Sequence, residues 1–244
     1  MNILVVNDDG YEAPGIHILA SKLKRFGNVT VVGPDGGRSA TGHGIVLHGT
    51  LSFEFVREED GIKWYKTSGT PADCTRLGLA LFEEKFDIVF SGVNNGLNVG
   101  TDIIYSGTVA GAREAQIEDV ASVAISTDFG CFDIVNKEID ALLDLVFDKK
   151  LYSKEYVLNI NFPTCNFKES KGIKVCRQGI KNFKTKFVKN EEGRYINQDD
   201  IIIYDQNPGT DVYEGLNGYT TIVPLKVSQS DADSIEKINN LLKK

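Results

Sequence analysis

The chain has 244 residues, of which 41% are hydrophobic and 25% charged, and its formal net charge is −7. This composition is ordinary for a globular protein with one main domain. The acidic balance argues against binding to a nucleic-acid duplex, which requires a basic surface, although it does not exclude a mononucleotide whose charge a metal ion neutralises. No apolar stretch reaches the length of a membrane span, and no basic segment precedes an apolar one at the N-terminus. We therefore expect no membrane association and a cytoplasmic location.

The cysteines and histidines do not indicate a soft-metal or redox site. The four cysteines (Cys74, Cys131, Cys165 and Cys176) lack the paired spacing of a zinc or redox motif, so we expect reduced thiols. The three histidines are too scattered in the sequence to build a metal site.

The N-terminal segment is the most informative part of the sequence. Residues Ile3 to Asn7 predict a buried parallel strand, which stops at Asp8, Asp9 and Gly10. The carboxyl ends of such strands are where open α/β sheets bind ligands. Adjacent carboxylates repel each other unless a cation lies between them, and a hard divalent ion with oxygen ligands fits this need. The alternative is that Asp8 caps the next helix and Asp9 belongs to a solvated turn; these residues alone leave both open.

A strand–helix–strand unit follows. Pro14 begins a helix that ends at Gly27, and residues 29–32 form the second strand, so the sheet begins parallel and right-handed. In the glycine-rich loop after this strand, Ser39 is either a neutral oxygen ligand or a turn residue. Arg38 is either a phosphate-facing charge or a surface arginine.

The next segments alternate strands and helix starts. Residues 45–56 predict a strand or hairpin, and residues 64–67 another strand. Thr70 is the expected N-cap of a helix, with Pro71 at its first position and Asp73 at its positive end. This capping role accounts for Thr70 and Asp73 without a ligand.

Two loops in tandem then point to a binding site. A strand over residues 86–90 runs into the glycine- and asparagine-rich loop 91–100, which is costly to order and offers neutral oxygen ligands. The following helix begins at Ser106-Gly107-Thr108, where small side chains leave backbone N–H groups free for phosphate. The alternative is a plain serine cap. A divalent ion beside a helix-end anion site suggests hydrolysis of a phosphate ester.

The C-terminal third changes character. Phe183, Phe187, Tyr195 and the run Ile201–Tyr204 flank a polar turn at residues 190–193, which predicts a protruding β-hairpin suited to a subunit interface. The remaining expected elements are strands over 122–126, 156–162 and 219–227, helices around 139–146 and 235–242, and a loop that begins at residues 208–211.

Taken in order, these motifs resemble the SurE family of stationary-phase survival proteins. The resemblance covers nearly the whole chain, and six motifs in sequence make it specific. The motifs are Asn7-Asp8-Asp9-Gly10, Arg38-Ser39-Ala40, Gly69-Thr70-Pro71-Ala72-Asp73-Cys74, Ser91-Gly92-Val93-Asn94, Asn98-Val99-Gly100 and Tyr105-Ser106-Gly107-Thr108-Val109-Ala110-Gly111-Ala112, with weaker echoes further on.

The resemblance implies a function and a site. Family members are metal-dependent phosphatases of nucleoside 5′- and 3′-monophosphates, and some also trim short polyphosphate. It implies that one Mg²⁺ or Mn²⁺ ion is bound by four residues and that the phosphate is held by four others. The expected metal ligands are Asp8, Asp9, Ser39 and Asn94; the expected phosphate-binding residues are Asn98, Ser106, Gly107 and Thr108.

The resemblance also implies a fold and an assembly. We expect an α/β protein with a Rossmann-like three-layer core and a mostly parallel sheet over residues 1–165. Residues 166–244 would form a C-terminal extension, with a protruding hairpin and a terminal helix, that completes the domain and exchanges between subunits. A homo-oligomer, either a dimer or a tetramer, is therefore expected.

Two positions depart from the family pattern. Ala40 stands where a glycine usually follows the metal-ligand serine. Some relatives also carry a histidine soon after the final proline–leucine pair, whereas Leu225 here is followed by Lys226 and no histidine occurs later. If that histidine protonates the leaving group, this chain uses water or another residue.

We expect Asp8 and Asp9 to be the catalytic residues, with Asp9 also orienting the attacking water and the N–H groups near Gly107 and Thr108 stabilising transition-state charge. One rival is a receiver-like signalling module that binds Mg²⁺ through two acidic residues. Such a module needs a further aspartate at its central strand end, where this chain has Ser91 to Asn94. Another rival is a non-catalytic nucleotide-binding protein.

Overall fold

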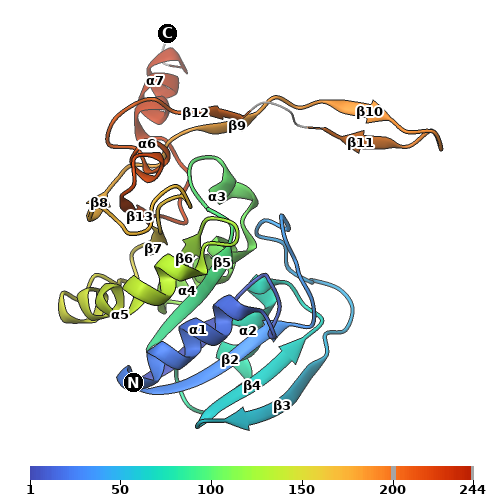
Figure 1. Cartoon of the computed structure of the whole chain (residues 1–244). Coiled ribbons are helices and arrows are strands. Elements are labelled where there is room, and N and C mark those ends of the chain that lie inside the picture. Colours follow the sequence, from blue (N-terminus) through green and yellow to red (C-terminus); the bar gives the residue numbers. More distant parts are fainter. Residues whose placement is uncertain (199–201, 243–244) are drawn as a thin grey trace.

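A nine-stranded sheet forms the centre of the protein in the computed structural model, which describes residues 1–198 and 202–242 (Figure 1). The strand order is β3-β4-β2-β1-β5-β6-β7-β13-β8. Strands β4 to β7 in this order are parallel, while β3 and β13 run antiparallel to β4 and β7. The strands are β1 (Asn2–Val6), β2 (Asn28–Pro34), β3 (Phe53–Glu59), β4 (Ile62–Thr67), β5 (Ile88–Asn95), β6 (Ala121–Thr127), β7 (Val157–Asn161), β8 (Ile173–Val175) and β13 (Thr220–Leu225). The predicted α/β class with a mostly parallel sheet is confirmed.

Helices cover both faces of this sheet, which gives the three expected layers. On one face, α1 (Pro14–Leu23) and α5 (Phe132–Asp148) bury a shared apolar cluster against β1, β5 and β6. On the other face, α2 (Pro71–Leu81) and α4 (Gly107–Ile117) pack on the opposite side of β1, β2 and β5. The Ile3–Val6 run is fully buried because side chains on both faces of its strand meet a helix layer.

The chain changes direction across the sheet between β1 and β5. From β1 it passes through α1 to β2 on one side, and β5 pairs with β1 on the other. Their carboxyl ends thus form a topological switch point, where open α/β sheets bind ligands. Helix α1 approaches β5 closely here, since a Cβ atom added at Gly15 would lie 1.8 Å from the Val93 carbonyl oxygen. Only glycine permits this approach.

Three sequence-based boundaries are wrong. Strand β5 continues to Asn95 with an irregularity between Ser91 and Asn94, so half of the expected loop belongs to the sheet. Residues 45–52 form no strand; the Val46 N–H instead donates to the Asp73 carboxylate at 3.2 Å beside α2. The expected loop after Thr210 contains the short helix α6 (Asp211–Leu216).

The C-terminal extension adds β8 and β13 to the sheet and sends out an arm between them (Figure 1, orange). In the arm, β9 (Lys181–Phe183) pairs with β12 (Ile202–Tyr204), and β10 (Phe187–Lys189) pairs with β11 (Tyr195–Asn197) across the 190–193 turn. The helix α7 (Ala232–Leu242) ends the described chain. The predicted hairpin and terminal helix are therefore present, although Ile201 lies outside the described residues.

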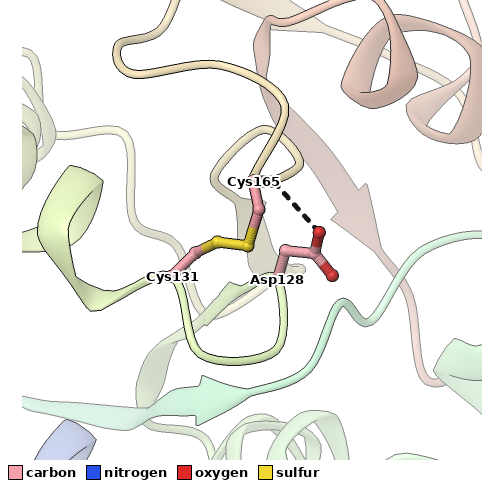
Figure 2. Close-up of side chains that lie close together, drawn as sticks. All are labelled: Asp128, Cys131 and Cys165. Atoms are coloured by element: carbon pink, nitrogen blue, oxygen red, sulfur yellow. Dashed lines mark hydrogen bonds between the residues drawn. A yellow bond between two sulfur atoms is a disulfide. The ribbon is translucent and has the colours of Figure 1, made fainter.

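The expectation of four reduced cysteines is wrong for two of them. Cys131 and Cys165 form a disulfide at the ends of β6 and β7, with their Cα atoms 5.7 Å apart (Figure 2). The two cysteines are 34 residues apart and belong to no sequence motif. They meet because β6 and β7 are neighbouring strands, which brings the loops after them together. Cys74 and Cys176 remain free and buried.

Candidate active site

A cleft of about 780 Å³ opens at the switch point. Four parts of the chain line it: the turn after β1, the loop after β2, the segment from the end of β5 through α3 (Asp102–Tyr105) to Ser106, and the base of the arm. The lining residues used below are Asp8, Asp9, Ser39, Asn94, Asn98, Ser106, Tyr105 and Lys181. The structure thus gathers six of the eight sequence-predicted site residues in one cleft.

Asp8 is buried directly after β1 and is held from two sides. Its carboxylate accepts a hydrogen bond from the Thr108 hydroxyl at 2.5 Å, and its carbonyl accepts one from the Arg38 N–H at 2.7 Å. Burial raises the pKa of Asp8 to about 6; the Asp9 charge adds to this rise, and the Thr108 hydrogen bond opposes it. The carboxylate is fixed in place before any ligand arrives.

Asp9 points to the same cleft because the chain turns sharply after it. The Asn7 side chain donates to the Gly10 carbonyl at 2.8 Å, and Gly10 has a φ of 107°, a conformation that favours glycine. The Asp9 carboxylate accepts the Asn95 N–H at 3.0 Å from the end of β5. Burial raises the pKa of Asp9, and the Asn95 hydrogen bond partly offsets this.

Ser39 and Asn94 bring neutral oxygens to the cleft. The Asn94 side-chain nitrogen donates to the Gly96 carbonyl at 2.7 Å, which leaves its side-chain oxygen without a described donor. Ser39 is exposed on the loop after β2. The next residue, Ala40, has a φ of 57°, so the position at which the family pattern leads us to expect glycine adopts the left-handed conformation.

This donor set fits a hard divalent cation. Two carboxylates lie side by side at the edge of the core, and within residues 1–198 and 202–242 neither is paired with a lysine, arginine or histidine. Burial is the main cause of the raised pKa of both groups, because it disfavours the charged carboxylate. Carboxylate, hydroxyl and amide oxygens are the ligands that Mg²⁺ and Mn²⁺ prefer.

The expected phosphate-binding residues divide into two groups. Asn98 and Ser106 line the cleft; the Ser106 hydroxyl also accepts the Val109 N–H at 3.0 Å as the cap of α4. Gly107 and Thr108 lie behind Asp8 instead. A Cβ atom added at Gly107 would lie 2.8 Å from the Asp8 Cβ, and Thr108 is fully buried against the Asp8 carboxylate.

Asn98 is tied to the far strands of the sheet. Its side-chain nitrogen donates to the Ser126 hydroxyl at 2.8 Å, and its backbone N–H donates to the Asn161 side chain at 2.7 Å. The side chain is therefore oriented by β6 and β7. The other amide hydrogen of the same nitrogen has no acceptor in the described part of the chain, so it can bind a ligand.

Arg38, Thr70 and Asp73 have structural roles outside the cleft. Arg38 donates to the Asp35 carboxylate at 2.8 Å and to the Ser68 carbonyl at 3.2 Å, so it braces its own loop. Thr70 and Asp73 form a reciprocal capping box at the start of α2.

Sequence reasoning missed two contributors to the cleft. Tyr105 is an exposed aromatic residue at its edge, and Lys181 reaches it from the base of the arm, where its ammonium group pairs with Asp102 at 2.5 Å. Tyr105 stood inside a recognised motif, whereas no local signal marks Lys181, which lies 79 residues from its partner.

The fold and this site define a class: an α/β enzyme with an acidic, oxygen-rich cleft at its switch point. Comparison with known proteins then identifies the family. The family profile "Survival protein SurE" matches residues 3–185. A 5′-nucleotidase SurE from Clostridium botulinum (strain 657 / Type Ba4) is 41% identical over 99% of both chains, and one from Clostridium beijerinckii is 38% identical over the full length of both.

A solved structure agrees with these relatives. The SurE protein from Aquifex aeolicus superimposes with a TM-score of 0.80 at 34% identity, covering 99% of each chain. The chain belongs to the SurE family, and it is a hydrolase of the nucleotidase type that its curated relatives represent.

Proposed function

We propose that this protein is a metal-dependent phosphomonoesterase that hydrolyses nucleoside 5′- and 3′-monophosphates to nucleoside and phosphate, with short polyphosphate as an additional substrate. The observation that carries the proposal is the pair of adjacent carboxylates, Asp8 and Asp9, beside Ser106 at the capped start of α4; neither has a salt-bridge partner among the described residues. The relatives named 5′-nucleotidase SurE support the substrate class. They also favour it over the receiver-like and non-catalytic alternatives.

In this proposal Asp8, Asp9, Ser39 and Asn94 hold one Mg²⁺ or Mn²⁺ ion. When bound, the ion polarises a phosphoryl oxygen and helps ionise the attacking water. Asp8 acts as a rigid anchor, because Thr108 and the Arg38 N–H fix it. One carboxylate oxygen of Asp9 accepts the Asn95 N–H, so the other oxygen can orient the attacking water.

The phosphate is bound from the opposite wall of the cleft. Asn98 offers an amide hydrogen, and Ser106 stands at the positive end of α4, where the helix favours a negative charge. Gly107 and Thr108 were expected to contact phosphate directly; we propose that their N–H groups add to the same positive potential from behind Asp8. Lys181 also reaches the cleft edge, where its charge is balanced by Asp102.

The leaving group is protonated without a C-terminal histidine. Of the three histidines, His43 hydrogen-bonds Glu114 at 2.6 Å, His17 stacks on Trp64, and none lines the cleft. We therefore propose that solvent supplies this proton, which fits the open mouth of the cleft.

The test is release of inorganic phosphate from 5′-AMP, 3′-AMP and a synthetic phosphomonoester after chelation, and again after Mg²⁺ or Mn²⁺ is restored. Activity that disappears with chelation and returns with metal supports the proposal. A matched control is Asp60→Asn, in an exposed turn where the φ of 52° suits asparagine. Absence of phosphate release with every metal and substrate would contradict it.

We further propose that the protein is a cytoplasmic homo-oligomer, a dimer or tetramer, and that residues 166–244 form the extension through which it assembles. Support comes from apolar side chains exposed on the arm, such as Phe187 and Tyr195, and on α7, such as Ile238 and Leu241. In the described residues, no helix combines the length and hydropathy needed to cross a bilayer.

A further inference from the structure

The Cys131–Cys165 disulfide lies beside the candidate active site. Cys131 is the N-cap residue of α5, and Cys165 follows β7 on an exposed turn. Asp128, which follows β6, completes the group: its carboxylate accepts the Cys165 N–H at 3.0 Å, and its ligand oxygen and both sulfurs lie within 4.8 Å of one another (Figure 2). An acidic side chain therefore faces both sulfur atoms.

A short chain of hydrogen bonds joins this group to Asp9. The Cys131 N–H donates to the Asp128 carbonyl at 3.0 Å, which closes the 128–131 turn. Within that turn, the Gly130 N–H donates to the Asn95 side-chain oxygen at 2.8 Å. The Asn95 N–H in turn donates to the Asp9 carboxylate at 3.0 Å. The turn that carries one cysteine thus orients the residue that holds Asp9.

We propose that Cys131 and Cys165 are a reversible redox modification site whose state controls, through the 128–131 turn and Asn95, how firmly Asp9 is held for metal binding. The coupling to the metal rests on the proposed function, whereas the modification itself does not. In the cytoplasmic location proposed above, a disulfide is usually transient or redox-sensing rather than structural, which agrees with this role. This agreement depends on that location, whereas the geometry does not.

The exchange reaction needs a dithiol as the reductant. A thiolate of the dithiol attacks the Sγ atom of the exposed residue Cys165, the bond between the two protein sulfurs breaks, and Cys131 leaves as a thiolate. The second thiol of the dithiol then attacks the mixed disulfide and releases Cys165. Two electrons and two protons pass to the protein, and the dithiol becomes a disulfide.

The surroundings of Cys131 act on this step in opposite directions. The N-terminal end of the long helix α5 stabilises the leaving thiolate. The Asp128 carboxylate opposes the same negative charge. Asp128 is therefore placed to slow reduction and to keep the pair oxidised until a strong dithiol reductant arrives.

Thiol labelling under native conditions tests the modification site. Cys74 and Cys176 are buried, and burial raises the pKa of both thiols, to about 11 for Cys176, so they react poorly. We expect two rapidly labelled thiols after treatment with a dithiol and none after mild oxidation. Two labelled thiols that persist after oxidation would overturn the proposal.

Reduction kinetics test the role of Asp128. Asp128→Asn keeps an oxygen for the Cys165 N–H but removes the charge, so reduction by dithiothreitol should become roughly 10-fold faster at low salt. The control is Asp133→Asn, an exposed carboxylate in the first turn of α5 outside the sulfur group, which should change the rate much less. Equal rates for Asp128→Asn and the control would contradict this part.

The coupling is tested by metal titration and amide exchange on the oxidised protein, the reduced protein and the double variant Cys131→Ser/Cys165→Ser. Reduction should weaken Mn²⁺ binding roughly 10-fold, as expected for a residue one step from a metal ligand, and increase exchange at the Gly130 and Asn95 amides. The double variant should match the reduced protein in both Mn²⁺ affinity and amide exchange, whether or not dithiol is present.

The outcomes separate this inference from the proposed function. If neither redox state binds Mn²⁺ or releases phosphate, the proposed function fails, and amide exchange at Asn95 then decides the coupling alone. Identical Asn95 exchange in the oxidised and reduced proteins would overturn the coupling whatever the metal data show.

Discussion

The switch point of the sheet buries polar side chains, whereas the C-terminal arm exposes apolar ones. At the switch point, charged and polar side chains such as Asp8 and Thr108 are buried, and backbone or hydroxyl donors hold them in place. On the arm, apolar side chains on both faces of β10 and β11 are exposed, and the hairpin has no core of its own. The first region is ordered by contacts within its own chain, whereas the second leaves apolar side chains uncovered by the described residues, which is why we propose it as a subunit interface.

The largest effect is expected where the polar network is broken at its centre. Asp9→Asn removes one of the two charges that we propose as metal ligands. It should lower phosphate release by roughly 100-fold or more, because changing even a residue one step from a metal ligand costs about 10- to 100-fold. Steady-state kinetics with saturating Mn²⁺ would measure this. Full activity in Asp9→Asn, at the level of the Asp60→Asn control, would show that Asp9 is not required for metal binding or catalysis.

A structural change next to Asp8 should have the next largest effect. Gly107→Ala would bring a methyl group to 2.8 Å from the Asp8 Cβ and 3.0 Å from the Pro71 Cγ. We expect destabilisation of about 1–3 kcal/mol with reduced activity, measured by thermal unfolding and phosphate release. The control is Gly215→Ala in α6, where no atom lies within 4 Å of the added methyl group. Equal melting temperatures for the two variants would contradict the close packing at Gly107.

In the metal-free protein, Asp8 should decrease stability at neutral pH. Its folded-state pKa of about 6 lies above the ordinary value of 3.8, so the folded state binds the proton more tightly. The free energy of unfolding should therefore fall as pH rises from about 4 to about 6. Asp8→Asn removes this penalty and should stabilise the chelated protein at pH 7 by on the order of 2 kcal/mol, while activity is lost. Denaturant unfolding at pH 4 and pH 7 checks it, and a variant less stable than the parent at pH 7 would contradict it.

Changes on the arm should alter assembly rather than the fold. Val188 and Ile196 face each other across the hairpin, so Val188→Ser/Ile196→Ser removes one apolar face. We expect a smaller particle by light scattering and a melting temperature lowered by a few degrees or less, since neither side chain is in the core. Glu191→Ser at the tip is the control. An unchanged particle size in the double variant would show that this face is not an interface.

The smallest effect is expected at Ala40. Glycine there would relieve the left-handed conformation, but it would also loosen the unfolded chain, so Ala40→Gly should change stability by less than about 1 kcal/mol. The rate of phosphate release should stay within about twofold of the parent rate, because the hydrogen bonds described for the Asp8 and Asp9 carboxylates do not involve residue 40. A large loss of activity would mean that the Ser39 loop depends on the alanine methyl group.

Local structure around the switch point could be predicted from the sequence for a physical reason. Buried strands and capped helices carry local patterns, so β1, α2 and the turn at Gly10 could be predicted from adjacent residues. The alternation of apolar and polar residues over 45–52 led to a wrong strand prediction. Such a pattern shows that a segment is amphipathic, but not whether a sheet edge is free to pair with it. Here β3 already occupies the edge beside β4.

Contacts between distant segments could not be predicted. The Asn95 N–H on Asp9, Lys181 in the cleft and the Cys131–Cys165 pair each depend on how the sheet orders its strands. Helix α6 was missed because its six residues carry a cap at Thr210 but are too short for a helical stripe.

The position of the arm in the sheet has a consequence for how this protein can diverge. Strands β8 and β13 are neighbours, with Ile173 opposite Thr220, so the arm leaves and re-enters at one edge. Lengthening or shortening the arm at its tip, residues 190–193, changes mainly the entropy of closing a loop, about 0.6 kcal/mol for each doubling of length. The base of the arm lines the cleft, whereas the tip does not. Mutation and selection can therefore change the tip of the arm in small steps while the lining of the cleft stays the same.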